Sequence, residues 1–377
     1  MQTLIKNLRV VSPDLDLEGA SIGIESGKIA KVYAAGDQLP DAESVIDGSG
    51  LTAMPGFVDI HSHGADGCDT VDDSTESVAH IAKRKLGEGV TTWLPTTLTL
   101  PQEHLLKAAG NVANYMANQE FAKTPGMHVE GPFINPKCTG AQNPAFVRLP
   151  DIAELKEIHE VAPALVCSVA PEMEGASEFI AAATEMGVRC SAAHTAATHE
   201  DFKTAKAAGL KHLTHFCNQM SGLHHREIGI VGSGLIDPDI MIEIICDGIH
   251  LCPDMLKLTF ALKPIEQMIM ITDSMAGSWL PDGEIQLGGL PVVVEGGIAR
   301  VKETGALAGS TLLFNDGVRI VAELTEMPLD QLVKATSWNQ AQSLGLDGIG
   351  KIEPGFAADL VLLDADFKVQ HTLVDGQ

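Results

Sequence analysis

The sequence predicts an α/β protein: a (β/α)8 TIM-like barrel with a small β-sandwich domain formed from both chain ends. Three observations support this fold class. Eight short apolar runs recur between residues 53 and 344, helical patterns separate them, and both chain ends alternate apolar and polar residues. Alternation of strand and helix indicates a parallel sheet, and eight such units favour a closed barrel.

The candidate barrel strands share a short apolar run that is bounded by turn or helix signals. They span residues 57–61, 90–95, 127–130, 165–169, 188–192, 212–216, 241–245 and 268–272. Helical patterns lie at residues 75–88, 101–121, 151–160, 175–187, 198–208, 225–236, 253–263 and 314–343. Residues 287–301 form a predicted hairpin after the eighth strand. In such a barrel, sites lie at the carboxyl ends of the strands, so functional residues are expected there.

The two chain ends differ from the middle of the chain. Residues 3–50 and 358–376 are predicted to form short strands joined by tight turns, and we expect the two sets of strands to pair. The predicted organisation is therefore a small domain of residues 1–52 plus 345–377 and a catalytic barrel of residues 53–344.

The chain is strongly acidic. Its 377 residues carry 25 Lys and Arg against 50 Asp and Glu, a formal net charge of −25. This charge argues against nucleic acid or an anionic membrane surface as a partner, and an anionic substrate would need a local positive site. Seven scattered cysteines without a Cys-x-x-Cys pair predict a reduced, cytoplasmic protein. No apolar run approaches the roughly 20 residues of a membrane span, and the run at 240–246 contains Glu243.

Residue types that can bind metal ions lie at the ends of five candidate strands. His61 and His63 end the first strand, and side chains two residues apart in a strand point the same way, so both imidazoles can reach one ion. The others are Glu130, His194, His215 and Asp273. A single histidine is more often an ordinary polar residue, but six such residues at equivalent strand ends favour a site for Zn, Fe or a similar divalent ion.

Several segments around these residues match a known pattern. They are residues 55–64, 128–133, 193–197, 214–220, 247–250, 272–275 and 307–310. On these segments the chain resembles the amidohydrolase superfamily and, within it, the N-acetylglucosamine-6-phosphate deacetylase family. Glu130 followed by Gly131 and Pro132 is the most family-specific match, whereas residues 350–361 match a wider superfamily pattern. The resemblance covers nearly the whole chain.

The resemblance implies one or two divalent metal ions per chain. Glu130, His194 and His215 would hold the main ion. His61 and His63 would hold a second ion in binuclear members, with Glu130 placed between the two ions. Zinc is the first expectation, and Fe, Co, Mn and Ni are compatible with the same ligands.

One departure from the family pattern bears on the number of ions. Some relatives with a single metal ion have glutamine where this chain has His63, and histidine where it has Gln142. In those relatives the histidine helps to hold the substrate carbonyl. Because this chain has the opposite combination, we expect two metal sites, with Gln142 as a lesser contact to the substrate.

Other residues match the reaction and substrate positions of the family. Asp273 would act as general base and then as general acid, and a ligand carboxylate is the alternative role, compatible with the first. The matching substrate positions are Gln142, Asn218, Gln219, Arg226, His250 and Leu307. In relatives the counterpart of Arg226 reaches a neighbouring subunit's site, which implies a homodimer. Without the resemblance, the basic run at 224–226 would be interpreted as a solvated helix start.

The expected reaction is hydrolysis of the acetamide of N-acetyl-D-glucosamine 6-phosphate to D-glucosamine 6-phosphate and acetate. A metal ion lowers the pKa of its bound water and polarises the carbonyl, and a nearby carboxylate moves the proton. The alternatives are deacetylation of N-acetylgalactosamine 6-phosphate, another amide hydrolysis on this scaffold and, more remotely, a non-catalytic binding barrel. The last is disfavoured because Asp273 and all the metal-ligand residues are present.

Overall fold

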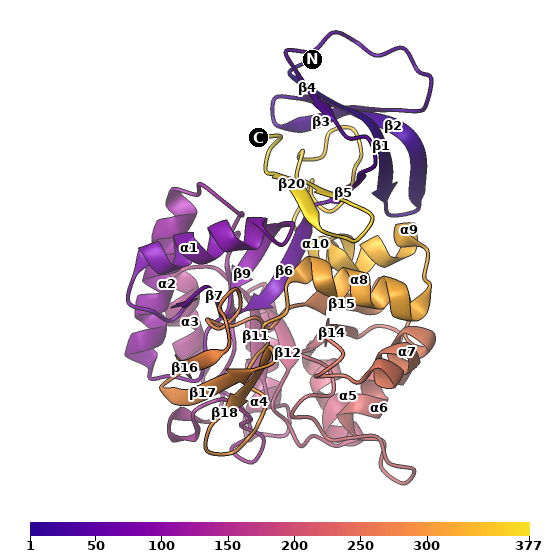
Figure 1. Ribbon diagram of the computed structural model, residues 1–377. Helices are drawn as coiled ribbons and strands as arrows, with labels where there is room; N and C mark the ends of the chain where they lie inside the picture. Colours follow the sequence, from indigo (N-terminus) through magenta and orange to yellow (C-terminus); the bar gives the residue numbers. More distant parts are fainter.

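The computed structural model describes all 377 residues, Met1–Gln377. Figure 1 shows a large α/β body and, above it, a sheet in which both chain ends lie. None of the helices combines the length and the apolar character needed to cross a lipid bilayer.

Eight parallel strands form the centre of the α/β body. They are β6 (Phe57–Ser62), β9 (Val90–Pro95), β10 (Met127–Val129), β11 (Ala164–Val169), β12 (Arg189–Ala192), β13 (His212–Leu213), β14 (Met241–Ile245) and β15 (Met268–Ile271). Strands β10 to β15 form one sheet in chain order, and β6 pairs with β9. Parallel bridges join Ser62 to Ser274 and Thr96 to His128, so the eight strands follow one another around a ring. All eight predicted strands are confirmed; β13 is shorter than predicted because the chain turns after Leu213.

Helices connect most of these strands, as the sequence predicts. They are α1 (Thr75–Leu86), α2 (Gln102–Ala117), α3 (Ile152–Val161), α4 (Ala176–Glu185), α5 (His199–Ala208), α6 (Gly229–Ile236) and α7 (Pro253–Leu262). The helix predicted over 225–236 begins only at Gly229, because two backbone hydrogen bonds between His224 and Glu227 close a tight turn. Arg226 therefore lies on a loop and not at a helix start, which corrects the sequence interpretation.

The helix predicted over 314–343 is divided, which is a second correction. The segment forms α8 (Phe314–Thr325), α9 (Leu329–Leu332), the 3-10 turn η3 (Val333–Thr336) and α10 (Trp338–Leu344). Glu326 has a left-handed backbone, with φ of 52°, and ends α8. Pro328 follows, and proline cannot donate the backbone hydrogen bond that a continuous helix requires.

The sheet above the body contains strands from both chain ends. They are β1 (Thr3–Ser12), β2 (Leu15–Glu25), β3 (Lys28–Tyr33), β4 (Ser44–Asp47), β5 (Thr52–Pro55), β19 (Leu360–Leu363) and β20 (Val369–Leu373). Antiparallel pairing of β5 with β19 confirms that the two ends join. All seven strands belong to one connected sheet, with an apolar cluster that includes Ile5, Ile22 and Leu362. The exact domain boundaries and the packing as a sandwich stay predictions.

A small antiparallel sheet lies beside the end of β15. It consists of β16 (Gly283–Leu287), β17 (Leu290–Glu295) and β18 (Ile298–Val301), and the last two form the predicted hairpin. Its apolar side packs against Leu98 and Met275 from the loops of the barrel. Because Met275 follows closely after β15, this packing fixes the small sheet next to the strand ends. A shorter pair, β7 (Gly64–Ala65) and β8 (Cys68–Asp69), follows β6.

Candidate active site

The six predicted metal-ligand side chains meet at the carboxyl ends of the barrel strands. His61 lies in β6 and His63 just after it, and the others follow β10, β12, β13 and β15: Glu130, His194, His215 and Asp273. The backbone of the last three is left-handed, with φ of 46°, 32° and 51° respectively. Non-glycine residues rarely adopt this conformation, and those that do cluster at functional sites.

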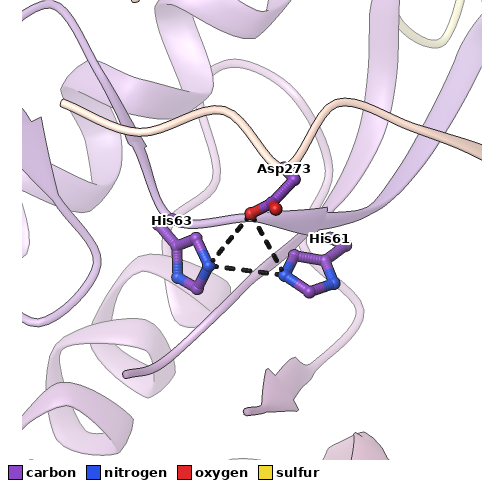
Figure 2. Close-up of side chains that lie close together, drawn as sticks. All are labelled: His61, His63 and Asp273. Atoms are coloured by element: carbon purple, nitrogen blue, oxygen red, sulfur yellow. Dashed lines mark hydrogen bonds and ion pairs between the residues drawn. The ribbon is translucent and has the colours of Figure 1, made fainter. Parts of the chain in front are cut away.

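One group of ligand atoms comes from His61, His63 and Asp273, which we call the His63 triad. Figure 2 shows the three side chains pointing toward one another. The two Nε2 atoms are 3.3 Å apart, and Asp273 Oδ1 lies 3.4 Å from His61 Nε2 and 3.2 Å from His63 Nε2. A tetrahedral ion with bonds of about 2.0–2.1 Å holds its ligand atoms about 3.3 Å apart, so the triangle fits one ion.

The second group comes from Glu130, His194 and His215, which we call the His215 triad. Glu130 Oε1 lies 3.3 Å from His194 Nε2 and 3.1 Å from His215 Nε2, and these nitrogens are 3.2 Å apart. This triangle therefore also fits one ion. The other oxygen of Glu130, Oε2, lies 3.2 Å from His63 Nε2. Glu130 thus stands between the two triads, in the position of a carboxylate that two ions could share.

The outer ring nitrogens fix the orientation of two of the histidines. His63 Nδ1 lies 3.2 Å from the carbonyl oxygen of Thr96, and His194 Nδ1 lies 2.8 Å from that of Cys138. A carbonyl oxygen only accepts hydrogen bonds, so in each neutral ring Nδ1 carries the proton and Nε2 keeps its lone pair. Such nitrogens, together with carboxylate oxygens, are ligands of Zn and other divalent transition metals, so the residues fit an ion of this kind.

The charges at the two triads favour a cation. Burial disfavours the ionised carboxyls, yet the adjacent histidines hold the pKa of Glu130 well below its usual range and lower that of Asp273 to about 2. Burial also opposes protonation of His63, but hydrogen bonds to Asp273 and Glu130 raise its pKa to about 10. For His215, burial prevails and lowers the pKa. Ionised carboxylates in a buried site attract positive charge, as protons on the histidines or as metal ions.

A buried carboxylate supports His61 from the far side of the site. Glu243 belongs to β14, and its Oε2 lies 3.8 Å from His61 Nδ1. Neither of these two atoms has a hydrogen-bond partner. The other oxygen, Oε1, accepts a hydrogen bond from His212 Nδ1 at 2.9 Å. Although burial raises the pKa of Glu243, His212 and His61 lower it below its usual range, so the carboxylate is ionised and faces His61, a predicted metal ligand.

A buried lysine ties β6 to the end of β15. Lys85, from α1, is fully buried and donates to Asp59 Oδ2 and Glu88 Oε2, both at 3.1 Å, and to Ser274 Oγ at 2.9 Å. Asp59 Oδ2 also accepts a hydrogen bond from Thr272 Oγ1 at 2.6 Å. This network joins the strands that supply the His63 triad, so it fixes the distances within that triad.

The Gln142 side chain contacts Glu130, one of the predicted metal ligands. Its Nε2 donates to Glu130 Oε2 at 2.7 Å, and its Oε1 accepts from the Thr99 N–H at 2.6 Å. Both polar ends are therefore used within the protein, and the side chain holds Glu130 in place. Gln142 also lines the cavity described next, and its contact with the substrate stays a prediction.

The two triads open into a cavity of about 350 Å³. The predicted substrate residues that line it are Gln142, Asn218, Gln219, His250 and Leu307. Arg226 does not line it; this residue is exposed on its loop, where its Nη1 lies 2.6 Å from His225 Nε2. A single chain thus keeps Arg226 away from its own cavity, and the predicted role at a neighbouring site stays a prediction.

The sequence analysis missed Arg300, a residue of β18 that also lines the cavity. Arg300 is the only Lys or Arg among the lining residues. His250 is the second group that can carry positive charge. Burial opposes its protonation, but the hydrogen bond between its Nδ1 and Asp247 Oδ2, at 2.6 Å, raises its pKa. We call the two triads the floor of the cavity. The residues Asn218, Gln219, His250, Arg300 and Leu307 are its rim.

The fold and the floor define a class of protein: a ring of parallel strands with histidine and carboxylate ligands for divalent metal ions at the strand ends. Comparison with known proteins agrees with this class. The chain belongs to the amidohydrolase family, which it matches over residues 52–377.

Individual relatives match the whole chain. The N-acetylglucosamine-6-phosphate deacetylase of Bacillus subtilis (strain 168) is 34% identical over 99% of this chain and 96% of its own. The N-acetylgalactosamine-6-phosphate deacetylase of Escherichia coli O157:H7 is 34% identical over 100% and 99% of the two chains. The crystal structure of N-acetylglucosamine-6-phosphate deacetylase from Thermotoga maritima superposes with a TM-score of 0.90 at 36% identity, covering 99% and 98%. These similarities confirm the resemblance in the motifs, and they imply a TIM-like barrel.

Proposed function

We propose that this protein hydrolyses the acetamide of N-acetyl-D-glucosamine 6-phosphate to D-glucosamine 6-phosphate and acetate. The observation that carries the proposal is Asp273, a carboxylate that lies within the His63 triad and lines a cavity with a positive rim. Similarity over the full chain to deacetylases of amino-sugar phosphates supports it. The cavity volume of about 350 Å³ suits a small-molecule substrate.

Asp273 moves the proton in the proposed reaction. Its pKa of about 2 keeps the carboxylate ionised at neutral pH, so it accepts a proton from the attacking water as the new C–O bond forms. The same carboxyl group then gives that proton to the nitrogen as the C–N bond breaks, because an amine leaves only once it is protonated. Asp273 Oδ1 lies 3.2 Å from His63 Nε2, so the carboxylate stands within the His63 triad.

We propose two divalent ions per chain, one in each triad, with Glu130 shared between them. Zinc is the first choice, and Fe, Co, Mn and Ni are compatible with the same nitrogen and oxygen ligands. The bound ions supply a lowered pKa for the attacking water and polarisation of the acetamide carbonyl. The backbone contacts of His63 and His194, and the contact of Gln142 with Glu130, hold the ligand atoms in place.

The rim would hold the sugar phosphate. Gln219 has a left-handed backbone, with φ of 51°, and its N–H has no acceptor within the chain, so it can donate to a phosphate oxygen. His250 adds positive charge, and Asn218 and Leu307 line the same space. We propose that Arg226 completes the rim of a second copy of the chain, which makes the active form a homodimer.

A second candidate substrate is N-acetylgalactosamine 6-phosphate. The observation that favours it is the E. coli deacetylase of that sugar, which is as similar to this chain as the B. subtilis deacetylase, at 34% identity. The two sugars are epimers that differ at one hydroxyl group, so the choice depends on one or two hydrogen bonds within the same cavity.

The test is release of acetate by the metal-reconstituted protein from a panel of N-acetyl amino sugars with and without a 6-phosphate. We expect the highest kcat/KM for N-acetylglucosamine 6-phosphate and almost no activity for the Asp273→Asn variant. A higher kcat/KM for the galactosamine epimer would select the second candidate. Absence of acetate release from every sugar would refute both.

We propose two further features of the chain that follow from its sequence. Residues 1–52 plus 345–377 form a small domain packed as a β-sandwich, and residues 53–344 form the catalytic barrel. The seven cysteines are all free thiols, which supports a reducing, cytoplasmic location.

A further inference from the structure

We infer that Arg300 binds the phosphate group of the substrate within its own chain and so makes the site selective for phosphorylated amino sugars. The inference rests on the proposed function and adds a residue to the rim. It starts from the charge of the cavity: Arg300 is the only permanently cationic side chain that lines it, in a chain with a formal net charge of −25. An anionic substrate requires such a group in this acidic protein.

The alternation of β18 turns Arg300 away from the protein interior. Its neighbours Ala299 and Val301 are buried, 2% and 3% exposed, in the apolar cluster that packs against the barrel loops. Successive side chains in a strand point to opposite faces, so Arg300 lies on the face of β18 opposite Ala299 and Val301, and from there it lines the cavity. The packing of its two neighbours therefore determines the direction of the Arg300 side chain.

The position of Arg300 is fixed relative to the floor. Val301 N–H donates to Ala306 O at 2.8 Å and Ala308 N–H donates to Ala299 O at 3.1 Å, so the chain returns alongside β18. Two residues later, Ser310 N–H donates to Asp273 O at 2.7 Å. A short run of backbone hydrogen bonds thus connects the strand that carries Arg300 to the residue that moves the proton.

Gly309 allows this connection. Its backbone is left-handed, with φ of 56°, and a Cβ atom there would lie 2.9 Å from Asp273 O. A larger residue would push the returning segment away from the end of β15. The segment that returns alongside β18 is therefore in close backbone contact with Asp273. This contact keeps Arg300 at a fixed place on the cavity wall.

The guanidinium group is held in place but retains free donors. Arg300 Nη1 donates to Gly305 O at 3.1 Å, which leaves the Nε and Nη2 hydrogens for a ligand. A planar guanidinium fork matches phosphate oxygens, and charge-assisted hydrogen bonds to phosphate are among the stronger ones in proteins. His250 lines the same cavity, so a second nitrogen donor of the same chain is available to the ligand that Arg300 binds.

Arg226 and Arg300 make different demands on assembly. Arg226 is exposed on a loop and does not line the cavity of its own chain, and its proposed place is at the rim of a neighbouring subunit. Arg300 needs no partner, because it already lines the cavity of its own chain. Recognition of the phosphate would then persist in a monomer, with Arg226 adding affinity in a dimer.

The test compares Arg300→Ala with Lys302→Ala, using N-acetylglucosamine 6-phosphate and N-acetylglucosamine as substrates. Lys302 is a matched control: it lies on the same hairpin, is exposed, pairs with Glu284 at 2.7 Å and does not line the cavity. We expect Arg300→Ala to raise KM for the phosphorylated sugar about 10- to 100-fold, as for loss of a charged hydrogen bond. The KM for the unphosphorylated sugar and kcat for both should stay within about twofold, and Lys302→Ala should resemble the wild type.

An equal rise of KM for both sugars would overturn the inference, as would an effect of Arg226→Ala alone. If the wild-type protein released no acetate from either sugar, the proposed function would fail, and binding of inorganic phosphate would still test Arg300. Calorimetry should then show phosphate binding by the wild type and by Lys302→Ala, and its loss in Arg300→Ala. Undiminished phosphate binding by Arg300→Ala would overturn the assignment.

Discussion

The floor and the rim of the cavity carry opposite charges and differ in how far their side chains are exposed. On the floor, Glu130 and Asp273 are 1% and 7% exposed, and each lies within 3.5 Å of histidine nitrogens of the two triads. On the rim, Arg300 and Gln219 are exposed, and they belong to a hairpin and a turn. The floor is thus a buried cluster of ionisable groups, whereas the rim combines these exposed groups with the partly buried Asn218, His250 and Leu307.

This difference assigns separate tasks to the two regions. Buried carboxylates favour cations, so the floor suits metal ions and the transfer of a proton. The exposed guanidinium of Arg300 at the opening suits the anionic end of a substrate. A change on the floor should therefore lower kcat for any acetamide, whereas a change on the rim should alter KM for phosphorylated substrates alone.

The largest effect is expected for Asp273→Asn. The substitution keeps the size of the side chain but removes the base, and general acid–base catalysis contributes about 10²–10⁴-fold to a rate. We expect kcat to fall by about that range for phosphorylated and unphosphorylated substrates alike. Acetate release measured at saturating substrate checks this, with metal content determined on the same samples. A fall confined to the phosphorylated sugar would contradict the division between floor and rim.

The next largest effect is expected for a pair of substitutions that distinguishes the two triads. His215→Ala removes a ligand of the proposed main ion. Loss of a residue that only hydrogen-bonds to a metal ligand costs up to about 100-fold, so we expect loss of the ligand itself to lower kcat by more than that. His63→Ala should lower the metal content from two ions to one and have a smaller effect on kcat. Elemental analysis after reconstitution gives the number of ions per chain. A single ion in the fully active wild type, together with a harmless His63→Ala, would refute the binuclear floor.

The floor was largely predictable from the sequence. His61, His63, Glu130, His194 and Asp273 each stand at a strand end, and the barrel strands are recognisable as apolar runs. Strand ends of a parallel barrel meet on one face, so sequence position alone places these side chains together. The left-handed backbone at His194 and Asp273, which turns them inward, has no signal in the sequence.

The rim and the supporting residues were less predictable, because they depend on how separate segments pack. Arg300 is one charge in a hairpin, and only the packing of this hairpin against the barrel loops brings it to the cavity wall. Glu243 did leave a signal, as a charged residue within an apolar strand, but its target His61 lies far away in the sequence. Such a pairing emerges only when the ring of strands closes.

A moderate effect is expected for Glu243→Gln. The change removes the negative charge that faces His61 Nδ1 but keeps the volume of the side chain. Loss of such a partner of a metal ligand costs about 10–100-fold in metal affinity or activity, so we expect weaker binding of the ion in the His63 triad. Titration with a metal chelator checks this, and added metal should restore kcat if the residue acts by positioning His61. Unchanged metal affinity would show that Glu243 packs in the barrel without supporting metal binding through His61.

The smallest effect belongs to the rim and depends on pH. The hydrogen bond to Asp247 raises the pKa of His250 in spite of burial; Asp273 favours the same protonated form and Arg300 opposes it. His250 is positive below this raised pKa, so its attraction for phosphate is present at lower pH and is lost as pH rises through the pKa. We expect KM for the phosphorylated sugar to rise by about tenfold over that range, as for loss of one charged hydrogen bond.

The measurement is the ratio of kcat/KM for the phosphorylated sugar to kcat/KM for the unphosphorylated sugar, at a series of pH values. Titrations on the floor affect both sugars and cancel in this ratio, and measurement above pH 7 keeps the phosphate near its dianionic form. In the His250→Asn variant this ratio should no longer change with pH, and a persistent change would assign the pH dependence to another group.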